Sequence, residues 1–284
     1  MKENNKIHLT CEDYTVSHKK FNLFFNAEFE MLETFPQPKL EELSSYYESS
    51  EYISHTDSKK SIIDKTYHLV KKHTIQKKVN LINSFKTENK KLLDVGCGTG
   101  DFLVACKNNG WEINGVEPNL NAKKIIVSKL LNNEIIYSSL FEFSNEKFDV
   151  ITLWHVLEHV PNLQEYISEL KKLLKPNGVL IVAVPNFKSY DAEYYNEFWA
   201  AFDVPRHLWH FSKKSIDLLF SKHGMSVSKT LPMKFDSFYV SMLSEKYKTG
   251  KSNILRAFWI GLKSNIKAMS NNEYSSLIYV IKKG

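Results

Sequence analysis

Cysteine and glycine are both scarce in this chain of 284 residues. The three cysteines form no C-x-x-C pair, so neither a disulfide framework nor a four-thiolate zinc site can be built. No stretch approaches the roughly 20 consecutive apolar residues that a membrane-spanning helix needs, and the polar start MKENNKIHLT lacks the apolar region of a leader peptide. These absences predict a cytoplasmic globular protein with reduced thiols.

Charge is distributed unevenly along the chain. The net charge is +6, yet the part from Phe211 onward carries thirteen Lys or Arg against four Asp or Glu. Such an excess fits either a solvated lysine-rich face or contact with an anionic partner. No nucleic-acid-binding module is evident in the sequence, so nucleic acid is not an expected partner.

Residues from about 88 to the end alternate between strand-like and helix-like segments. Strand patterns occur in KKLLDV, WEINGVEP, KFDVITLW and NGVLIVAVPN, and helical patterns such as NAKKIIVSKLL and NLQEYISELKKLLK lie between them. Repeated β-α-β units of this length require a parallel sheet with helices on both faces. We therefore predict a doubly wound α/β domain over residues 88–284, preceded by an N-terminal cap over residues 1–87.

The octet DVGCGTGD, residues 94–101, follows the first of these strands. It places three of only ten glycines, Gly96, Gly98 and Gly100, within five residues. Glycine permits positive φ and lets the backbone approach a ligand at the positive end of a helix. Glu117 ends the second strand, where an acid commonly accepts hydrogen bonds from ribose hydroxyls. Together these residues predict a nucleotide-like ligand.

The spacing of the glycines separates the possible nucleotides. The dinucleotide pattern G-x-G-x-x-G/A, counted from Gly96, needs a small residue where Asp101 stands. No G-x-x-x-x-G-K-[ST] pattern of a P-loop occurs either. The observed spacing, G-x-G-x-G preceded by an acid, therefore disfavours NAD and a P-loop nucleotide.

In these segments the sequence resembles the class I S-adenosylmethionine-dependent methyltransferases. LLDVGCGTG, GVEPN, FDVITLWHVLEHV and LKPNGVLIVAVPN correspond to motifs of that family in order and spacing. The resemblance implies a mostly parallel seven-stranded sheet and S-adenosylmethionine as the cofactor. It assigns cofactor contacts to residues within the motifs: Asp94, Gly96, Cys97, Gly98, Gly100, Glu117, Pro118, Ser139, Leu140 and Trp154.

The same resemblance distributes parts of the cofactor among these residues. Asp94 and the glycines would hold its methionine end and Glu117 its ribose, while Ser139 and Leu140 would lie beside the adenine. Many members of the family carry an Asp near position 139, where this chain reads YSSLFEF. The adenine contact is therefore the part of the assignment in which this sequence departs from the family.

His155, Glu158 and His159 spell H-x-x-E-H, the order of ligands in one class of zinc peptidases. Pro161 and Asn162 mark a helix start just after the motif, whereas a peptidase helix would continue through it. We interpret the motif as part of the methyltransferase pattern and expect no metal. His155 follows a strand at the ligand-binding edge of the sheet, which makes it a candidate catalytic base or, alternatively, a residue that shapes the pocket.

Residues 187–211 are too long for a simple connection after the fifth strand. In FKSYDAEYYNEFWAAFDVPRHLWHF, aromatic residues crowd around Asp203, Arg206, His207 and His210. Long insertions at this edge commonly cover active sites, so we predict a lid-like insertion whose four polar residues contact the acceptor or its anionic group. A satellite core, in which they satisfy buried backbone groups, is the alternative.

The N-terminal segment resembles a small zinc ribbon found in a bacterial branch of the same family. Only Cys11 of the cysteine pairs is present, and Asn26 and Phe29 stand where a second C-x-x-C would fall. Metal binding by this degenerate module is not expected.

Residues 253–269 form a strongly amphipathic helical pattern. Large apolar residues share one face, while Arg256, Lys263 and Lys267 fall on another. The apolar face fits packing on the domain or on a second copy of the chain, and it also fits peripheral contact with an anionic membrane. Monomer and homodimer both remain open.

The sequence thus predicts methyl transfer from S-adenosylmethionine to a small or lipid-linked acceptor, on oxygen and without a metal. A sulfonium methyl is already activated, so the protein mainly has to align the acceptor, exclude water and remove a proton. Two alternatives are a catalytically silent scaffold that binds S-adenosylmethionine and an RNA or protein methyltransferase. The sequence lacks the N/D-P-P-Y signature of amine methylation.

Overall fold

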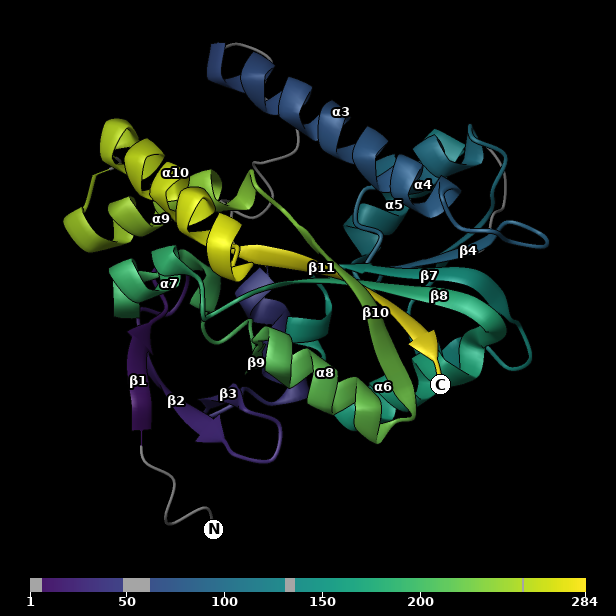
Figure 1. Cartoon of the computed structure of the whole chain (residues 1–284), viewed down its shortest axis with the longest axis horizontal. Helices are drawn as coiled ribbons and strands as arrows, with labels where there is room; N and C mark the ends of the chain where they lie inside the picture. Colours follow the sequence, from purple (N-terminus) through teal and green to yellow (C-terminus); the bar gives the residue numbers. More distant parts are fainter. Residues whose placement is uncertain (1–6, 48–61, 131–135, 252) are drawn as a thin grey trace.

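The larger of two sheets has seven strands in the order β10-β11-β8-β7-β4-β5-β6 (Figure 1). This computed structural model describes residues 7–47, 62–130, 136–251 and 253–284. The neighbours from β8 to β6 pair in parallel, whereas β11 runs antiparallel to both β8 and β10. The predicted doubly wound, mostly parallel sheet is confirmed. Its strands are β4 (Lys91–Val95), β5 (Glu112–Val116), β6 (Ile136–Tyr137), β7 (Phe148–Trp154), β8 (Leu174–Pro185), β10 (Met225–Pro232) and β11 (Ser276–Lys283).

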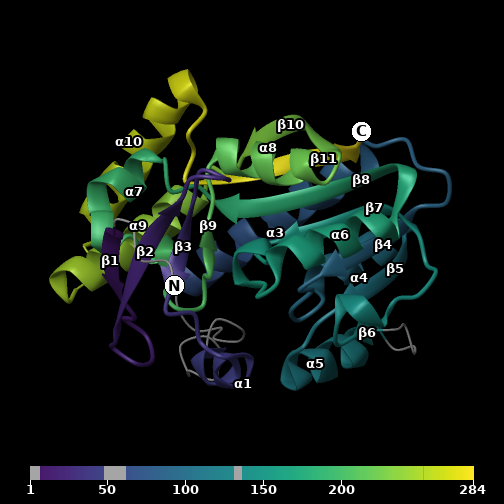
Figure 2. The same cartoon turned by 90° about the horizontal axis from the view of Figure 1, so that it is seen from below.

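Helices cover both faces of this sheet because its central strands are apolar on both sides. In β4, Leu92 packs in one buried cluster with Leu103, and the next residue, Leu93, packs in the other with Ile167. The first cluster lies under α3 (Ile62–Asn83), α4 (Asp101–Lys107) and α5 (Leu120–Leu130), and the second under α6 (Leu163–Leu173) and α8 (Lys213–Lys222) (Figure 2).

The second sheet joins two segments that are far apart in the sequence. It consists of β1 (Ile7–Glu12), β2 (Lys20–Asn26), β3 (Met31–Phe35) and β9 (Trp209–His210). The pairing of Leu32 with His210 connects the N-terminal segment to the insertion after β8. The division into a cap over 1–87 and a lid over 187–211 remains a prediction, but these two regions share one sheet.

Cys11 lies in the core of this smaller sheet. Burial raises the pKa of its thiol to about 12, which keeps the sulfur protonated. Asn26 donates a hydrogen bond to Glu33 and accepts one from the backbone of Phe29, so both positions serve the turn between β2 and β3. The thiol at position 11 is therefore part of the core packing of the smaller sheet.

The C-terminal helices α9 (Asp236–Thr249) and α10 (Ile254–Asn271) form a hairpin beside the short α7 (Tyr190–Tyr195), while α1 (Leu40–Leu43) lies near the smaller sheet (Figures 1 and 2). The predicted amphipathic helix is present. Of the three expected ways to cover its large apolar face, packing on the domain does not occur at Leu255 and Trp259, which are 76% and 64% exposed, whereas a second copy and a membrane stay predictions. In the described part of the chain, none of the helices combines the length and apolarity required for a membrane span.

Candidate active site

The glycine-rich turn connects β4 to α4 and is tied to the end of β5. The backbone N–H groups of Gly96 and Cys97 both donate to the carbonyl oxygen of Val116, at 2.8 and 3.0 Å. The N–H of Gly98 donates to Glu117 Oε2 at 2.8 Å. The two motifs that sequence analysis singled out are therefore in direct contact.

All three glycines of the turn have positive φ: 68° at Gly96, 57° at Gly98 and 78° at Gly100. A Cβ on Gly96 would lie 2.4 Å from a methyl group of Val156, and one on Gly100 would lie 3.0 Å from Ile126. A Cβ on Gly98 would meet nothing within 4 Å. Packing explains the first and third glycines, whereas Gly98 faces open space into which a ligand can approach the backbone.

Two buried carboxyl groups lie at this turn. Asp94 accepts a 2.6 Å hydrogen bond from the Thr152 hydroxyl, and burial raises its pKa to about 7 against the opposing effects of Thr152 and Lys78. Glu117 accepts hydrogen bonds from the N–H groups of Gly98 and Asn119, and burial raises its pKa as well. A positively charged ligand would favour the ionised form of both groups.

The side chain of Lys78 places a cation against the Trp154 ring. The ammonium group of Lys78 lies 4.2 Å from the centre of the Trp154 ring, where it also interacts with the charges of Asp94 and Asp236. Burial lowers the pKa of this lysine. The indole Nε1 of Trp154 is buried and has no hydrogen-bond partner among the described residues. Trp154 thus provides an aromatic ring that can accommodate a positive charge, and an indole N–H that has no partner among the described residues.

The remaining predicted cofactor residues lie along the same edge. Pro118 is exposed directly after Glu117. Ser139 caps the short helical turn Leu140–Glu142, and its hydroxyl accepts a hydrogen bond from the N–H of Phe141. The side chain of Leu140 is fully buried in the core, so only its backbone can face a ligand.

His155 lies at the carboxyl end of β7 with φ of 57°, and its N–H is bonded to the carbonyl of Ala183. Its Nδ1 is 3.3 Å from Glu158 and its Nε2 is 3.2 Å from Asp236. Burial alone would lower the pKa of the imidazole, but hydrogen bonds and charge from these two carboxylates raise it to about 10. The two flanking acids thus move the pKa of this imidazole well above the near-neutral value of an unperturbed histidine.

The Asp236→Asn variant tests this ion pair through the pH dependence of stability. Because the folded-state pKa of His155 is raised, the pair stabilises the fold fully below the unfolded pKa near 6.5 and loses its effect as pH rises towards 10. We expect Asp236→Asn to lower the free energy of unfolding most at pH 6 and least at pH 10, measured by urea denaturation. A pH-independent difference would contradict the assigned pair.

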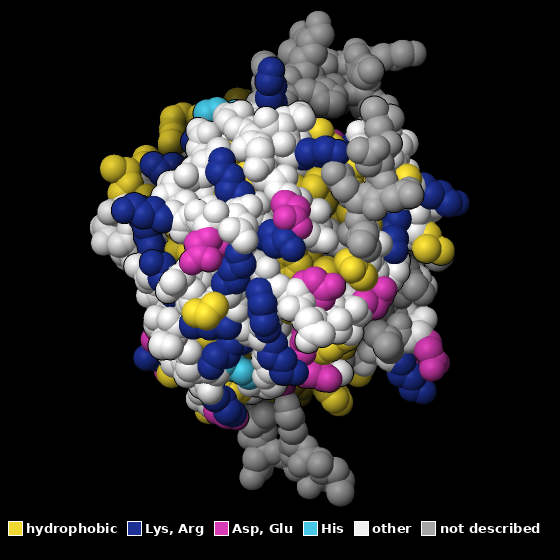
Figure 3. Space-filling model, turned by 90° about the vertical axis from the view of Figure 1, so that its right-hand side faces the viewer, with side chains coloured by type: hydrophobic (Ala, Val, Ile, Leu, Met, Phe, Trp, Pro, Cys, Tyr) yellow, Lys and Arg dark blue, Asp and Glu magenta, His cyan; other side chains and the backbone are white. Residues whose placement is uncertain are grey.

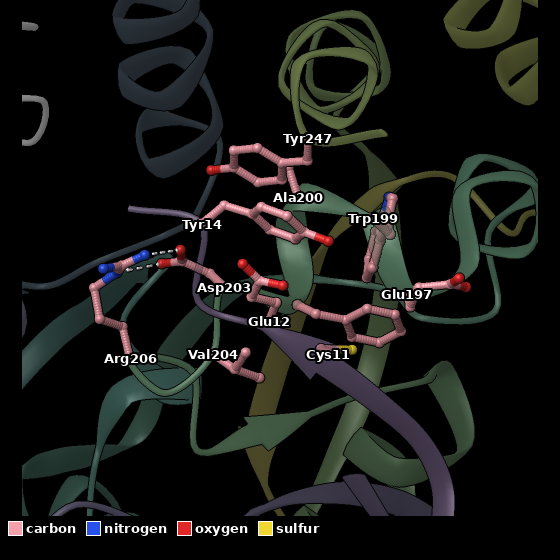
Figure 4. A pocket seen from close by; sticks show the side chains of 11 residues that line it. Cys11, Glu12, Tyr14, Glu197, Trp199, Ala200, Asp203, Val204, Arg206 and Tyr247 are labelled. Carbon is pink, nitrogen blue, oxygen red and sulfur yellow. Dashed lines mark hydrogen bonds and ion pairs between the residues drawn. The ribbon is translucent and has the colours of Figure 1, made fainter. Parts of the chain in front are cut away.

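The predicted lid residues occupy two environments. Asp203 accepts hydrogen bonds from two guanidinium nitrogens of Arg206, one at 2.9 Å, which lowers the pKa of the carboxyl despite its burial (Figure 4). His207 Nδ1 is 2.9 Å from the carbonyl oxygen of Ala201, and its Nε2 is 3.8 Å from Asp203. Asp203 and Arg206 line the small cavity shown in Figure 4, and His207 approaches this pair through Asp203.

His210 has a different setting, inside the smaller sheet. Its Nε2 is 2.9 Å from the Thr34 hydroxyl, which in turn donates to the carbonyl of His207. The ring is buried, and burial followed by the charge of His207 lowers its pKa well below the usual value. This setting favours the alternative of a satellite core for His210 over contact with the acceptor.

The H-x-x-E-H residues do not lie on one continuous helix. Glu158 and His159 belong to a single helical turn, Leu157–His159, whereas His155 precedes it in a left-handed conformation. This geometry differs from the continuous helix that carries the ligands of a zinc peptidase. However, ligand atoms of Glu158, His159 and His207 lie within 4.8 Å of one another, and Glu158 Oε2 has no hydrogen-bond partner among the described residues. These three side chains are where a metal ion would bind if the protein used one.

Comparison with protein families decides what kind of domain this is. A family model for a methyltransferase domain matches residues 67–230, more than half of the chain. The chain belongs to this family. Family membership confirms the resemblance to class I methyltransferases, for which S-adenosylmethionine is the methyl donor, and this methyltransferase domain contains the glycine turn, Glu117 and His155.

Curated relatives match parts of the methyltransferase chain. A ubiquinone biosynthesis O-methyltransferase from Pelagibacter ubique is 32% identical over 178 residues, covering 52% of this chain and 73% of the relative. A protein of the same name from Pasteurella multocida is 33% identical over 116 residues, covering 34% of this chain and 47% of the relative. This chain spans about half the length of several such relatives.

Solved structures with little sequence identity share the fold. The cyclopropane synthase MmaA2 from Mycobacterium tuberculosis has a TM-score of 0.55 at 12% identity, with 88% of this chain and all of that chain covered. Magnesium protoporphyrin IX methyltransferase from Synechocystis PCC 6803, solved with bound SAH, has a TM-score of 0.54 at 15% identity, with 84% and 97% covered. These likenesses extend to most of the methyltransferase chain.

Two residues of the site were missed by sequence reasoning. Asp236 begins α9, 81 positions after the histidine that it contacts, and Lys78 lies on α3, before the first motif. Neither residue stands in a recognisable pattern. Only the packing of α9 and α3 over the carboxyl edge of the sheet brings them to the site, and that packing leaves no local signal in the sequence.

Proposed function

We propose that the protein transfers the methyl group of S-adenosylmethionine to an oxygen atom of a small or lipid-linked acceptor. The observation that carries this proposal is the open space at Gly98 beside the buried carboxylate of Glu117. The relatives named as ubiquinone biosynthesis O-methyltransferases support oxygen as the accepting atom. Because this chain spans only part of several of them, the accepting atom has to be established by direct assay.

The residues around the turn fit this cofactor. When bound, it supplies an electrophilic methyl on a positively charged sulfur. Gly98 leaves room for close backbone approach, Glu117 keeps oxygen lone pairs for ribose hydroxyls, and Trp154 offers an aromatic face that already accommodates an ammonium group. If the sulfonium lies over this ring, the ammonium group of Lys78 has to move away from it.

His155 is the proposed acceptor-side base. It stands at the end of the strand next to β4, and its two carboxylate partners orient both ring nitrogens. When the acceptor hydroxyl replaces Asp236 at Nε2, the neutral ring can take its proton there, and Glu158 at Nδ1 stabilises the imidazolium that forms. With a pKa of about 10, the ring is mostly protonated at neutral pH, so this mechanism predicts faster turnover in alkaline solution.

The proposed mechanism requires no metal, and chelation tests this point. We expect turnover to be unchanged after incubation with EDTA and after addition of Mg²⁺ or Zn²⁺, because proton removal and methyl activation are both assigned without one. Loss of activity on chelation, restored by one of these ions, would contradict metal independence. The cluster of Glu158, His159 and His207 would then be the first place to look for the ion.

The experiment that tests the function is release of S-adenosylhomocysteine in the presence of alcohol, phenol, carboxylic acid and amine acceptors. We expect product with one of the hydroxyl classes and methylation on oxygen by mass spectrometry. Tight binding of S-adenosylmethionine without turnover on any acceptor would favour the scaffold alternative. Methylation on nitrogen only would favour the RNA or protein alternative.

A further inference from the structure

The helix α10 exposes its large apolar side chains and buries its small ones. Ala257, Gly261, Ser264 and Ala268 are buried against the domain, and a Cβ on Gly261 would lie 3.0 Å from the backbone of Phe238 in α9. Six of its large apolar residues are between 50% and 76% exposed: Ile254, Leu255, Phe258, Trp259, Ile266 and Met269. The hairpin with α9 therefore uses the small-residue face, and the apolar face remains uncovered in the described chain.

The exposed apolar face forms a continuous arc along the helix. At 3.6 residues per turn, Ile254 and Trp259 bound an arc of about 140°, within which the other four exposed apolar side chains fall. Arg256, Lys263 and Lys267 follow next around the helix. A helix with this cross-section is typical of one that lies in the plane of a membrane interface.

The charged residues in α10 and in the segment just before it are all basic. From residue 246 to residue 272 the sequence contains six Lys or Arg and no Asp or Glu. The ammonium groups of Lys263 and Lys267 lie 5.0 and 4.1 Å from the ring centre of Tyr190 in α7, beside the arc. The face shown in Figure 3 differs, because its basic and acidic side chains are interspersed and its hydrophobic side chains lie in small separate groups. Charge complementarity therefore calls for an anionic, apolar partner.

A second copy of the chain fits this face poorly. A two-fold interface brings the same patch from both copies together, so the cations bordering one arc would approach those of the other. The segment 246–272 supplies no acidic group to balance them. Like charges held together at an interface oppose association.

We propose that α10 docks the protein on the surface of a membrane that contains anionic phospholipids. The apolar arc enters the interface between headgroups and acyl chains, and the neighbouring cations contact the phosphates. Since α10 packs on α9, and Asp236 at the start of α9 pairs with His155, the docked helix is the neighbour of the helix that contacts His155. The docking does not depend on methyl transfer, although it would suit a lipid-linked acceptor.

Flotation of the full chain with lipid vesicles tests the proposal in the absence of S-adenosylmethionine and any acceptor. We expect binding at least about tenfold tighter to vesicles of phosphatidylcholine with phosphatidylglycerol than to phosphatidylcholine alone, and weakening by salt. Leu255→Asp should weaken binding by about tenfold or more. The matched control is Leu120→Asp on α5, because Leu120 is 71% exposed, close to the 76% of Leu255.

Three outcomes would overturn the docking proposal. The first is no binding to the anionic vesicles, and the second is equal weakening by Leu255→Asp and Leu120→Asp. The third is a dimer in sedimentation velocity that Leu255→Asp dissociates, which would assign the face to a second copy. Because no turnover is measured, failure here leaves the proposed methyl transfer untouched, and failure of methyl transfer leaves the docking untouched.

Discussion

The Gly98→Leu variant should lose at least about a hundredfold in affinity for S-adenosylmethionine, equivalent to about 2.7 kcal/mol. The Cβ of residue 98 points into space that is empty of protein atoms within 4 Å, so a leucine there fits the folded protein but occupies the proposed cofactor position. Isothermal titration calorimetry measures the loss directly.

Backbone strain is the confounding effect, and Gly110 provides the control. Gly110 also has positive φ, 79°, and open space at its Cβ, but it lies after the C-terminal end of α4, which is Lys107. Leucine at either position adds about 1–2 kcal/mol of left-handed strain. We therefore expect Gly98→Leu and Gly110→Leu to lower the melting temperature similarly, while only the former loses the cofactor. Equal cofactor affinity in the two variants would show that Gly98 does not border the site.

The His155→Gln variant should lower kcat/KM by about 10²-fold to 10⁴-fold, the range for removal of a general base. Glutamine keeps polar groups towards Glu158 and Asp236, so the buried carboxylate is not left without a partner. Affinity for S-adenosylmethionine should stay within about threefold of the wild type, since the imidazole is assigned to the acceptor and not to the cofactor.

The pH profile separates a base from a residue that only shapes the pocket. Wild-type kcat/KM should rise with pH up to about 10, following deprotonation of His155, and this rise should be missing in His155→Gln with the same acceptor. His223→Gln, in a histidine bonded to Gln164 at the C-terminal end of α8, should retain the wild-type profile. Parallel profiles for wild type and His155→Gln would remove the imidazole from proton transfer.

The sequence predicted the central sheet because strand and helix patterns alternate locally. The turn from Gly96 to Gly100 and its contact with Glu117 were also predictable, since a tight turn at the end of one strand faces the end of its parallel neighbour. Both features depend on short-range patterns that hydrophobic periodicity and glycine placement reveal.

Other features depend on packing between distant segments, for which the sequence has no local pattern. The pairing of β3 with β9 connects Leu32 to His210, and this contact assigns a predicted catalytic histidine to a structural place. The pair between Asp236 and His155 changes the expected charge of the imidazole. Periodicity located the large apolar face and the cationic face of α10, but not that Gly261 and its small neighbours form a third, buried face.

The structure of the complex with S-adenosylhomocysteine tests the central claim most directly. We predict that the ribose hydroxyls lie within hydrogen-bond distance of the Glu117 carboxylate and that the ligand passes over the backbone of Gly98, with the Lys78 ammonium displaced from the Trp154 ring. A ligand bound elsewhere would contradict this account. So would a Lys78 ammonium group that stays over the Trp154 ring at saturating ligand.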